Sequence, residues 1–192
     1  MTARRAFDVL VAGAALVLTA PLLAAAIVAI RLESKGHPIY RQRRVGKDGR
    51  PFDVLKLRTM VAGAESMGSG LAVTEGDARI TRVGALLRRT SVDELPQLVN
   101  VLRGDMAIIG PRPTVPVQVD QYTDRQRGRL AILPGLTGWA QVNGLRGETL
   151  TDADMQRRVE HDLFYIDNWS LWFDLRILVM TVVARSAFTN AY

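Results

Sequence analysis

The chain has 192 residues, of which 48% are hydrophobic and 23% are charged, a composition typical of one folded domain and not of a disordered chain. It contains no cysteine and two histidines, which excludes disulfides, thiol nucleophiles and a histidine-rich metal site. The formal net charge of +6 indicates an anionic partner and leaves nucleic acid, an anionic membrane surface and phosphorylated substrates open.

An uncharged, apolar run over residues 9–30 dominates the N-terminal part of the chain. As a helix it would reach about 30 Å, which is enough to cross the hydrocarbon core of a bilayer. A signal peptide would have a shorter apolar region followed by a cleavage site, so this run indicates a membrane anchor instead.

Pro21 and the flanking charges favour an anchor that enters and leaves the membrane on the same side. Pro21 lies near the middle of the run, where it removes a backbone hydrogen bond and kinks a helix. The positive-inside rule places basic clusters in the cytoplasm, and here they flank both ends. These residues are Arg4 and Arg5 before the run, and Arg31, Lys35, Arg41, Arg43 and Arg44 after it. A kinked helix that spans the membrane stays open, because prolines are tolerated in such helices.

Further along, two strand-like segments flank the turn residues 47–49 and predict a β-hairpin. The Gly- and Ser-rich stretch 60–76 predicts a mobile loop, and the motifs at 110–113 and 134–138 predict rigid turns. Residues 81–89 are predicted to form a short basic helix, and 91–102 a second helix with its leucines on one face. A polar-faced helix is predicted over 152–166 and an apolar helix over 170–188. Trp169 and Trp172 suit a membrane interface, so the last helix is a second span, an interfacial helix or a core helix.

Asp93 and Glu94 are adjacent carboxylates that are predicted to open a helix directly after Arg88 and Arg89. A helix N-terminus favours the ionised carboxylate, which suits both nucleophilic attack and Mg²⁺ binding. The same fragment also reads as a capping box, in which Ser91 and Glu94 satisfy the first N–H groups of the helix. Both interpretations stay open from this fragment alone.

The surrounding sequence is rich in arginine, and guanidinium groups bind phosphate oxygens in a bidentate manner. Arg112 stands out because Pro111 and Pro113 hold its backbone stiff, although a rigid turn without function is the alternative. For any other single arginine, a solvated basic surface is the simpler interpretation. P-loop and dinucleotide-binding glycine motifs are absent from the sequence.

Residues 77–113 strongly resemble the bacterial sugar transferase family, in particular its monotopic, small-domain polyprenyl-phosphate phosphoglycosyl transferases. The resembling block reads DARITRVGALLRRTSVDELPQLVNVLRGDMAIIGPRP. Three further blocks match and extend the resemblance over essentially the whole chain: IYRQRRVGKDGRPFDVLKLRTM, PGLTGWAQVNG and DLFYIDNWSLWFDLRILVMT. The chain resembles the minimal catalytic form, without the additional N-terminal membrane region of longer members.

The resemblance implies an α+β, mainly helical fold with a short β-hairpin and amphipathic interfacial helices. Residues 1–36 would form a re-entrant membrane helix-break-helix, and residues 37–192 a catalytic domain at the cytoplasmic face of the bacterial inner membrane. The break would lie at Ala20-Pro21, where members of the family often have Ser-Pro, so it is less secure here. Inner-membrane lipids are expected partners, nucleic acid is not, and a homodimer stays open.

The resemblance also implies a reaction. Asp93 would attack the sugar-bearing phosphate of a UDP-sugar, release UMP and hold a covalent phosphosugar, which polyprenyl phosphate would then accept. Asp93 and Glu94 would be the catalytic pair and would bind the required Mg²⁺. The expected substrate-binding residues are Lys56, Arg58, Arg79, Arg88 and Arg112. The helix dipole and the adjacent arginines are expected to keep the pKa of Asp93 low.

Two other classes of function compete with this one. A nucleic-acid-binding protein would fit the charge, but the chain lacks the usual recognition motifs and the apolar N-terminal run makes little sense there. A non-catalytic membrane scaffold of the same fold is the second alternative, and the intact Asp93-Glu94 pair argues against it. The sequence leaves the sugar open among glucose, galactose and N-acetylated hexosamines.

Overall fold

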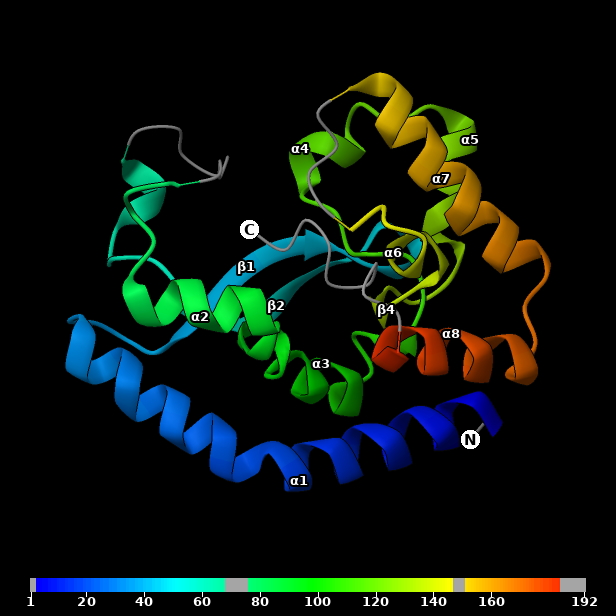
Figure 1. The fold of residues 1–192 in the computed structure, drawn as a ribbon. Helices are drawn as coiled ribbons and strands as arrows, with labels where there is room; N and C mark the ends of the chain where they lie inside the picture. Colours follow the sequence, from blue (N-terminus) through cyan, green and yellow to red (C-terminus); the bar gives the residue numbers. More distant parts are fainter. Residues whose placement is uncertain (1–2, 68–75, 147–150, 184–192) are drawn as a thin grey trace.

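A computed structural model describes residues 3–67, 76–146 and 151–183, which form a mainly helical fold with two small sheets (Figure 1). The helices are α1 (Ala3–Glu33), α2 (Arg82–Thr90), α3 (Gln97–Arg103), α4 (Pro116–Val119), α5 (Asp124–Arg127), α6 (Trp139–Val142), α7 (Asp152–Asp167) and α8 (Leu171–Val183). The strands are β1 (Ile39–Val45), β2 (Pro51–Leu57), β3 (Ala107–Ile109) and β4 (Gly135–Thr137).

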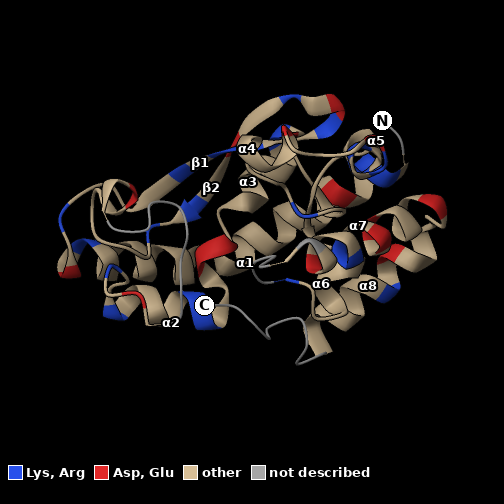
Figure 2. Cartoon of the chain, turned by 90° about the horizontal axis from the view of Figure 1, so that it is seen from above, with Lys and Arg blue, Asp and Glu red and all other residues tan. Residues whose placement is uncertain are grey.

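The predicted hairpin is confirmed. β1 and β2 pair in antiparallel register from Ile39 opposite Leu57 to Val45 opposite Pro51. Asp48 adopts a φ of 55° in the connecting turn, a left-handed conformation that Asp tolerates better than most residues. Figure 2 shows Lys and Arg residues along the hairpin strands, and charges of both signs on α7.

The second sheet was not predicted from the sequence. β3 and β4 pair in parallel, with Ala107 opposite Gly135 and Ile109 opposite Thr137. A Cβ atom on Gly135 would lie 2.1 Å from the backbone nitrogen of Gly110, so only glycine fits where these two segments approach. This close approach brings the turn after β3 next to the turn that precedes β4.

Two of the predicted helices differ from the structure. Residues 91–102 do not form one helix, because the chain makes a single 3₁₀ turn at Val92–Glu94 and α3 begins only at Gln97. The last helix ends at Val183, and residues 184–188 of its predicted range lie outside the described residues. Of the predicted loop over 60–76, residues 68–75 likewise lie outside them, and the preceding part contains a short 3₁₀ turn at Ala64–Ser66. The helices predicted over 81–89 and 152–166 are confirmed as α2 and α7.

The main core lies where α1, β2, α3, β3, α6, α7 and α8 meet. Its buried members include Ala12, Val54, Leu98, Val101, Met106, Ile109, Val142, Tyr165 and Ile177. A smaller cluster joins the C-terminal half of α1 to β2 and α2 through Ala26, Ile30, Leu57 and Leu87. The long N-terminal helix is therefore packed along the rest of the molecule over both of its halves.

Helix α1 is, among the described residues, the one helix long and apolar enough to cross a membrane. It continues through Pro21 without interruption, although its ribbon bends near the middle (Figure 1). The face of α1 that points away from the molecule is apolar and exposed at Val17, Leu18 and Leu32, which are 75–82% exposed. The predicted break at Pro21 is therefore not confirmed, because α1 is one continuous helix.

The N-terminal end of α1 is hydrogen-bonded to the rest of the domain. Arg5 donates to the carbonyl oxygen of Val101 in α3 at 2.6 Å. The Asp8 carboxylate accepts a hydrogen bond from the backbone N–H of Ile108 in β3 at 2.9 Å. These contacts fix the first turns of α1 against α3 and β3.

The C-terminal end of α1 is held in the same way. The Glu33 carboxylate accepts hydrogen bonds from the backbone N–H groups of Arg82 at 2.8 Å and Val83 at 3.0 Å, at the start of α2. Arg58 donates to the carbonyl oxygen of Ser34 at 2.9 Å, just past the end of α1. Both ends of the apolar helix are thus attached to one and the same domain.

Candidate active site

Asp93 and Glu94 lie in the 3₁₀ turn between α2 and α3. Helix α2 ends at Thr90, and Ser91 adopts a left-handed conformation with a φ of 57°, which redirects the chain into the turn. Both carboxylate side chains are buried, with residue exposures of 8% and 7%. The capping-box interpretation is wrong, because Ser91 makes no side-chain cap and its hydroxyl accepts a hydrogen bond from Arg146 at 2.9 Å.

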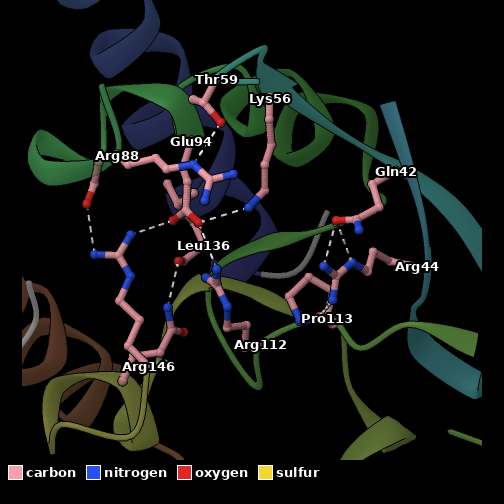
Figure 3. Close-up of polar contacts among 12 residues, drawn as sticks. Gln42, Arg44, Lys56, Thr59, Arg88, Glu94, Arg112, Pro113, Leu136 and Arg146 are labelled. Carbon is pink, nitrogen blue, oxygen red and sulfur yellow. Dashed lines mark hydrogen bonds and ion pairs between the residues drawn. The ribbon is translucent and has the colours of Figure 1, made fainter. Parts of the chain in front are cut away.

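Three cationic side chains converge on the carboxylate of Glu94 (Figure 3). Lys56 Nζ lies 3.2 Å and an Arg112 nitrogen 2.8 Å from Oε1, and Arg146 lies 2.7 Å from Oε2. Lys56 comes from β2, Arg112 from the turn after β3, and Arg146 from the segment after α6. Segments far apart in the sequence therefore meet at one carboxylate.

These cations keep Glu94 ionised. Burial by itself raises the pKa of Glu94, but Arg112, Lys56 and Arg146 together lower it well below its ordinary value. Burial also lowers the pKa of Lys56, and the attraction of Glu94 acts in the opposite direction. Glu94 therefore serves as a fixed negative charge that organises its cationic neighbours.

Asp93 has the opposite electrostatic character. Burial first, and then repulsion by Glu94, raise the pKa of Asp93 to about 6, although Lys56, Arg88 and Arg146 act to lower it. The expectation of a low pKa at Asp93 is therefore wrong. That expectation rested on the arginines that are adjacent in sequence. In the fold, burial and the neighbouring Glu94 carboxylate raise the pKa of Asp93 by more than the cations lower it.

The structure brings together three of the five expected substrate-binding residues. Lys56 and Arg112 contact Glu94 directly. Arg88 donates to the Thr59 hydroxyl at 2.8 Å, and its charge lowers the pKa of Asp93. The carboxylate pair thus lies within a cationic site that suits a diphosphate group.

Arg58 and Arg79 are directed elsewhere by the fold. Arg58 binds the end of α1, at the carbonyl oxygens of Ser34 and Lys35. Arg79 pairs with Asp77 at 2.6 Å and donates to the carbonyl oxygens of Ala64 and Met67 at 2.9 and 2.8 Å. These contacts attach the two guanidinium groups to neighbouring backbone segments.

Comparison with known sequences identifies the family of this chain. The sequence model of the bacterial sugar transferases matches residues 1–187. The chain belongs to the bacterial sugar transferase family.

Three curated relatives of this sugar transferase carry informative names. A UDP-glucose:undecaprenyl-phosphate glucose-1-phosphate transferase of Caulobacter vibrioides is 48% identical over 98% of this chain and 72% of the relative. One of the same name from Escherichia coli is 47% identical over 93% of this chain and 39% of the relative. A UDP-N-acetylgalactosamine-undecaprenyl-phosphate N-acetylgalactosaminephosphotransferase of Aeromonas hydrophila is 43% identical over 93% of this chain and 42% of the relative. The transferase spans less than half the length of the last two.

Arg146 lies in the site of the transferase but was not singled out from the sequence, and Ser91 was singled out only as a helix cap. Arg146 joins both, since it donates to the Ser91 hydroxyl and pairs with Glu94. The one sequence feature that could have drawn attention to Arg146 is the PGLTGWAQVNG block, which ends at Gly144, two residues before it. Nothing in the local pattern around Arg146 indicates that it reaches a carboxylate in another part of the chain.

Asp93 is a more suitable ligand for Mg²⁺ in this transferase than Glu94 is. The described part of the chain contains no cluster of three His, Cys, Asp or Glu residues that could hold a metal ion by themselves. Both Glu94 oxygens already contact cations, which would repel another positive ion. Asp93 remains as an oxygen ligand, and Mg²⁺ is commonly held by one or two carboxylates together with substrate phosphates and water.

Proposed function

We propose that the chain transfers a sugar-1-phosphate from a UDP-sugar to undecaprenyl phosphate, giving undecaprenyl-diphosphate-sugar and UMP. The observation that carries the proposal is the buried Asp93-Glu94 pair, whose two carboxyl groups have pKa values shifted in opposite directions. Such a split is typical of neighbouring carboxylates with different chemical tasks. The names of the relatives support the substrate class.

In this proposal Asp93 is the nucleophile. One of its carboxylate oxygens attacks the sugar-bearing phosphorus, a new O–P bond forms, and the bond to UMP breaks with its electron pair leaving on UMP. An oxygen of undecaprenyl phosphate then attacks the same phosphorus and releases the Asp93 carboxylate. A carboxylate with a pKa of about 6 is more basic, and therefore a better nucleophile, than one held ionised by three cations.

The cations that surround Glu94 are suited to bind the diphosphate of the donor. Three cationic side chains contact the single negative charge of Glu94: Lys56, Arg112 and Arg146. The group around Glu94 therefore carries a net positive charge. Preorganised cations of this kind stabilise the charge that develops on phosphate oxygens during transfer. Mg²⁺, held by Asp93 and the phosphates, would neutralise oxygens that otherwise repel an anionic nucleophile.

The proposed function is tested by UMP release. The full-length protein in detergent or nanodiscs is mixed with UDP-glucose, UDP-galactose, UDP-N-acetylglucosamine and UDP-N-acetylgalactosamine, each with and without undecaprenyl phosphate. We expect lipid-dependent UMP release from at least one donor. If no donor yields UMP and no lipid-linked sugar forms, the chain is a scaffold of the same fold and not an active transferase.

The raised pKa of Asp93 predicts an acid limb in the rate profile. Since only the carboxylate attacks, kcat/KM should fall about tenfold per pH unit as the pH drops below about 6. Protonation of Asp93 does not unfold the protein, because a raised folded-state pKa means that the protonated form is favoured by folding. Initial rates between pH 5 and pH 8, with melting temperatures at each pH, measure this limb. A rate that stays level down to pH 5 would rule out Asp93 as a group that must lose a proton near pH 6.

We infer further that α1 enters and leaves the membrane on the cytoplasmic side. Arg5 at its start and Glu33 at its end both hydrogen-bond to the same domain, whereas a spanning helix would place its ends on opposite sides of the membrane. The exposed apolar face of α1 would lie in the lipid. Helix α8 lies beside the N-terminal half of α1 (Figure 1) and exposes Trp172 and Val179, which suits a position in the interface.

Cysteine labelling tests this topology, because the natural chain contains no cysteine. Ala3 is the first residue of α1 and Lys35 lies just past its end, both at exposed positions, so each is replaced by cysteine. Lys47→Cys in the hairpin turn is the cytoplasmic control. We expect an impermeant maleimide to leave all three unlabelled in intact cells and to label all three in inverted membrane vesicles. Labelling of Ala3→Cys in intact cells would show that α1 spans the membrane.

A further inference from the structure

A buried arginine outside the carboxylate site, Arg129, donates a hydrogen bond to the backbone of Arg112. Arg129 lies in the 3₁₀ turn Gly128–Ala131 and is 3% exposed. It forms a salt bridge of 2.6 Å with Asp162 of α7, and both side chains are 2% exposed. A charged pair removed from water to this degree is not favourable by its own attraction alone, so its other contacts matter.

Two of those other contacts lie on the turn that presents Arg112. Arg129 donates to the backbone carbonyl oxygen of Arg112 at 3.1 Å. Its second terminal nitrogen donates to the hydroxyl oxygens of Thr114 at 3.2 Å and Tyr122 at 2.7 Å. The planar fork of one guanidinium therefore contacts the turn at two points and anchors it to α7 through Asp162.

The turn is held from its other side as well. Arg44 of β1 donates to the carbonyl oxygen of Pro113 at 3.1 Å, and Thr114 accepts a backbone hydrogen bond from Val45 at 2.9 Å. Figure 3 shows the Arg112 side chain extending from this turn towards Glu94. Because its backbone is fixed on both sides, the Arg112 guanidinium has little freedom to leave the 2.8 Å contact with Glu94.

We propose that Arg129, anchored by Asp162, is a positioning residue that fixes Arg112 against Glu94 in the competent geometry. This inference rests on the proposed function of the carboxylate site. The contacts of Arg129 are to the carbonyl of Arg112 and to buried hydroxyl groups, so it acts through Arg112 and not on the substrate. Without the Arg129 guanidinium, Pro111 and Pro113 still stiffen the turn. The turn then loses the hydrogen bonds that fix the position of the Arg112 backbone.

A kinetic double-mutant cycle separates positioning from general damage. Arg129→Gln should lower kcat/KM for UMP release by about 10²-fold, as expected when a group that binds the reacting centre is misplaced by about 1 Å. In an Arg112→Ala background the same change should lower kcat/KM by no more than about twofold, because the residue through which it acts is gone. Equal losses in both backgrounds would show that Arg129 serves stability alone and would overturn the proposal.

Two further variants guard against loss of fold. Arg129→Lys keeps the charge next to Asp162 but not the fork, so it should restore stability to a greater extent than activity. Val159→Ala removes buried packing from α7 and should lower the melting temperature about as much as Arg129→Gln does. Its kcat/KM should stay near that of the wild type. If Val159→Ala loses as much activity as Arg129→Gln at matched melting temperature, the positioning role is wrong.

A readout independent of turnover keeps this inference distinct from the proposed function. The Nε–H signal of Arg112 in the ¹⁵N-arginine NMR spectrum, assigned by its loss in Arg112→Lys, should be sharp in the wild type. It should broaden or shift in Arg129→Gln and stay unchanged in Val159→Ala. An unchanged signal in Arg129→Gln would overturn the proposal even if the protein is an active transferase. A changed signal would support it even if UMP is never released.

Discussion

Asp93→Asn should abolish transfer and leave a protein that is more stable than the wild type at neutral pH. The amide keeps the shape of the side chain but cannot attack phosphorus, so UMP release should fall by at least about 10⁴-fold, as when other enzymes lose their nucleophile. The predicted gain in stability follows from burial, which makes the ionised carboxylate unfavourable in the fold.

The direction of the stability effect follows from the pKa of Asp93, which folding raises from 3.8 to about 6. The folded protein binds this proton more tightly than the unfolded chain, so the contribution is complete below pH 3.8 and is lost as the pH rises through 6. At pH 7 the neutral amide should therefore stabilise the fold by on the order of 1–3 kcal/mol. Melting temperatures at pH 5 and pH 8 test this. The difference between variant and wild type should be larger at pH 8 than at pH 5, because it disappears only below pH 3.8.

Glu94→Gln is the matched comparison for this prediction. Glu94 is surrounded by Lys56, Arg112 and Arg146, so its loss leaves three buried or half-buried cations without their shared carboxylate. We expect Glu94→Gln to lower the melting temperature at every pH at which Glu94 is ionised, in contrast to Asp93→Asn. If the two variants shift the melting temperature in the same direction, the division of roles between the carboxylates is wrong.

Arg112→Ala should lower kcat/KM for the UDP-sugar by roughly 10- to 150-fold, since a lost hydrogen bond to a charged group is worth about 1.5–3 kcal/mol. The variant removes the contact with Glu94 and one of the cations expected to bind the donor diphosphate. Arg112→Lys keeps the charge but not the bidentate fork and should recover only part of the loss. Initial rates at sub-saturating UDP-sugar give kcat/KM directly.

A surface arginine supplies the control for Arg112. Arg125 forms a salt bridge with Glu160 at 2.7 Å, but its side chain is 68% exposed and lies outside the carboxylate site. Exposed pairs of this kind contribute little, so Arg125→Ala should leave kcat/KM within about twofold of the wild type. Near-normal rates in Arg112→Ala at sub-saturating donor would show that Arg112 is structural only.

The sequence predicted the parts of the fold that have a local signal. The hairpin followed from two strand-like segments around the turn at residues 47–49, and α2 and α7 followed from a basic and a polar-faced helical segment. The parallel pairing of β3 with β4 has no such signal, because each strand is three residues long and its partner lies far along the chain. The division of residues 91–102 into a 3₁₀ turn and α3 depends on the left-handed Ser91, a conformation that serine rarely adopts.

The sequence predicted which residues form the site, but not how all of them contact one another. The family motif pointed to Asp93 and Glu94, and Lys56, Arg88 and Arg112 do gather around them. Motif position alone could not show that Arg58 and Arg79 bind backbone carbonyl groups, because those partners are set by tertiary contacts. The pKa of Asp93 was wrongly expected to be low, since burial is a property of the fold that charge counting along the chain omits.

The central claim is that Asp93 carries the phosphosugar, and mass spectrometry tests it most directly. The wild type, Asp93→Asn and Glu94→Gln are each mixed with Mg²⁺ and a UDP-sugar labelled in the sugar, undecaprenyl phosphate is omitted, and intact protein and its peptides are analysed. We expect a phosphosugar adduct on the peptide that contains Asp93, with stoichiometric UMP release, and no adduct in Asp93→Asn. An adduct that persists in Asp93→Asn and disappears in Glu94→Gln, or efficient transfer to lipid without any adduct, would contradict it.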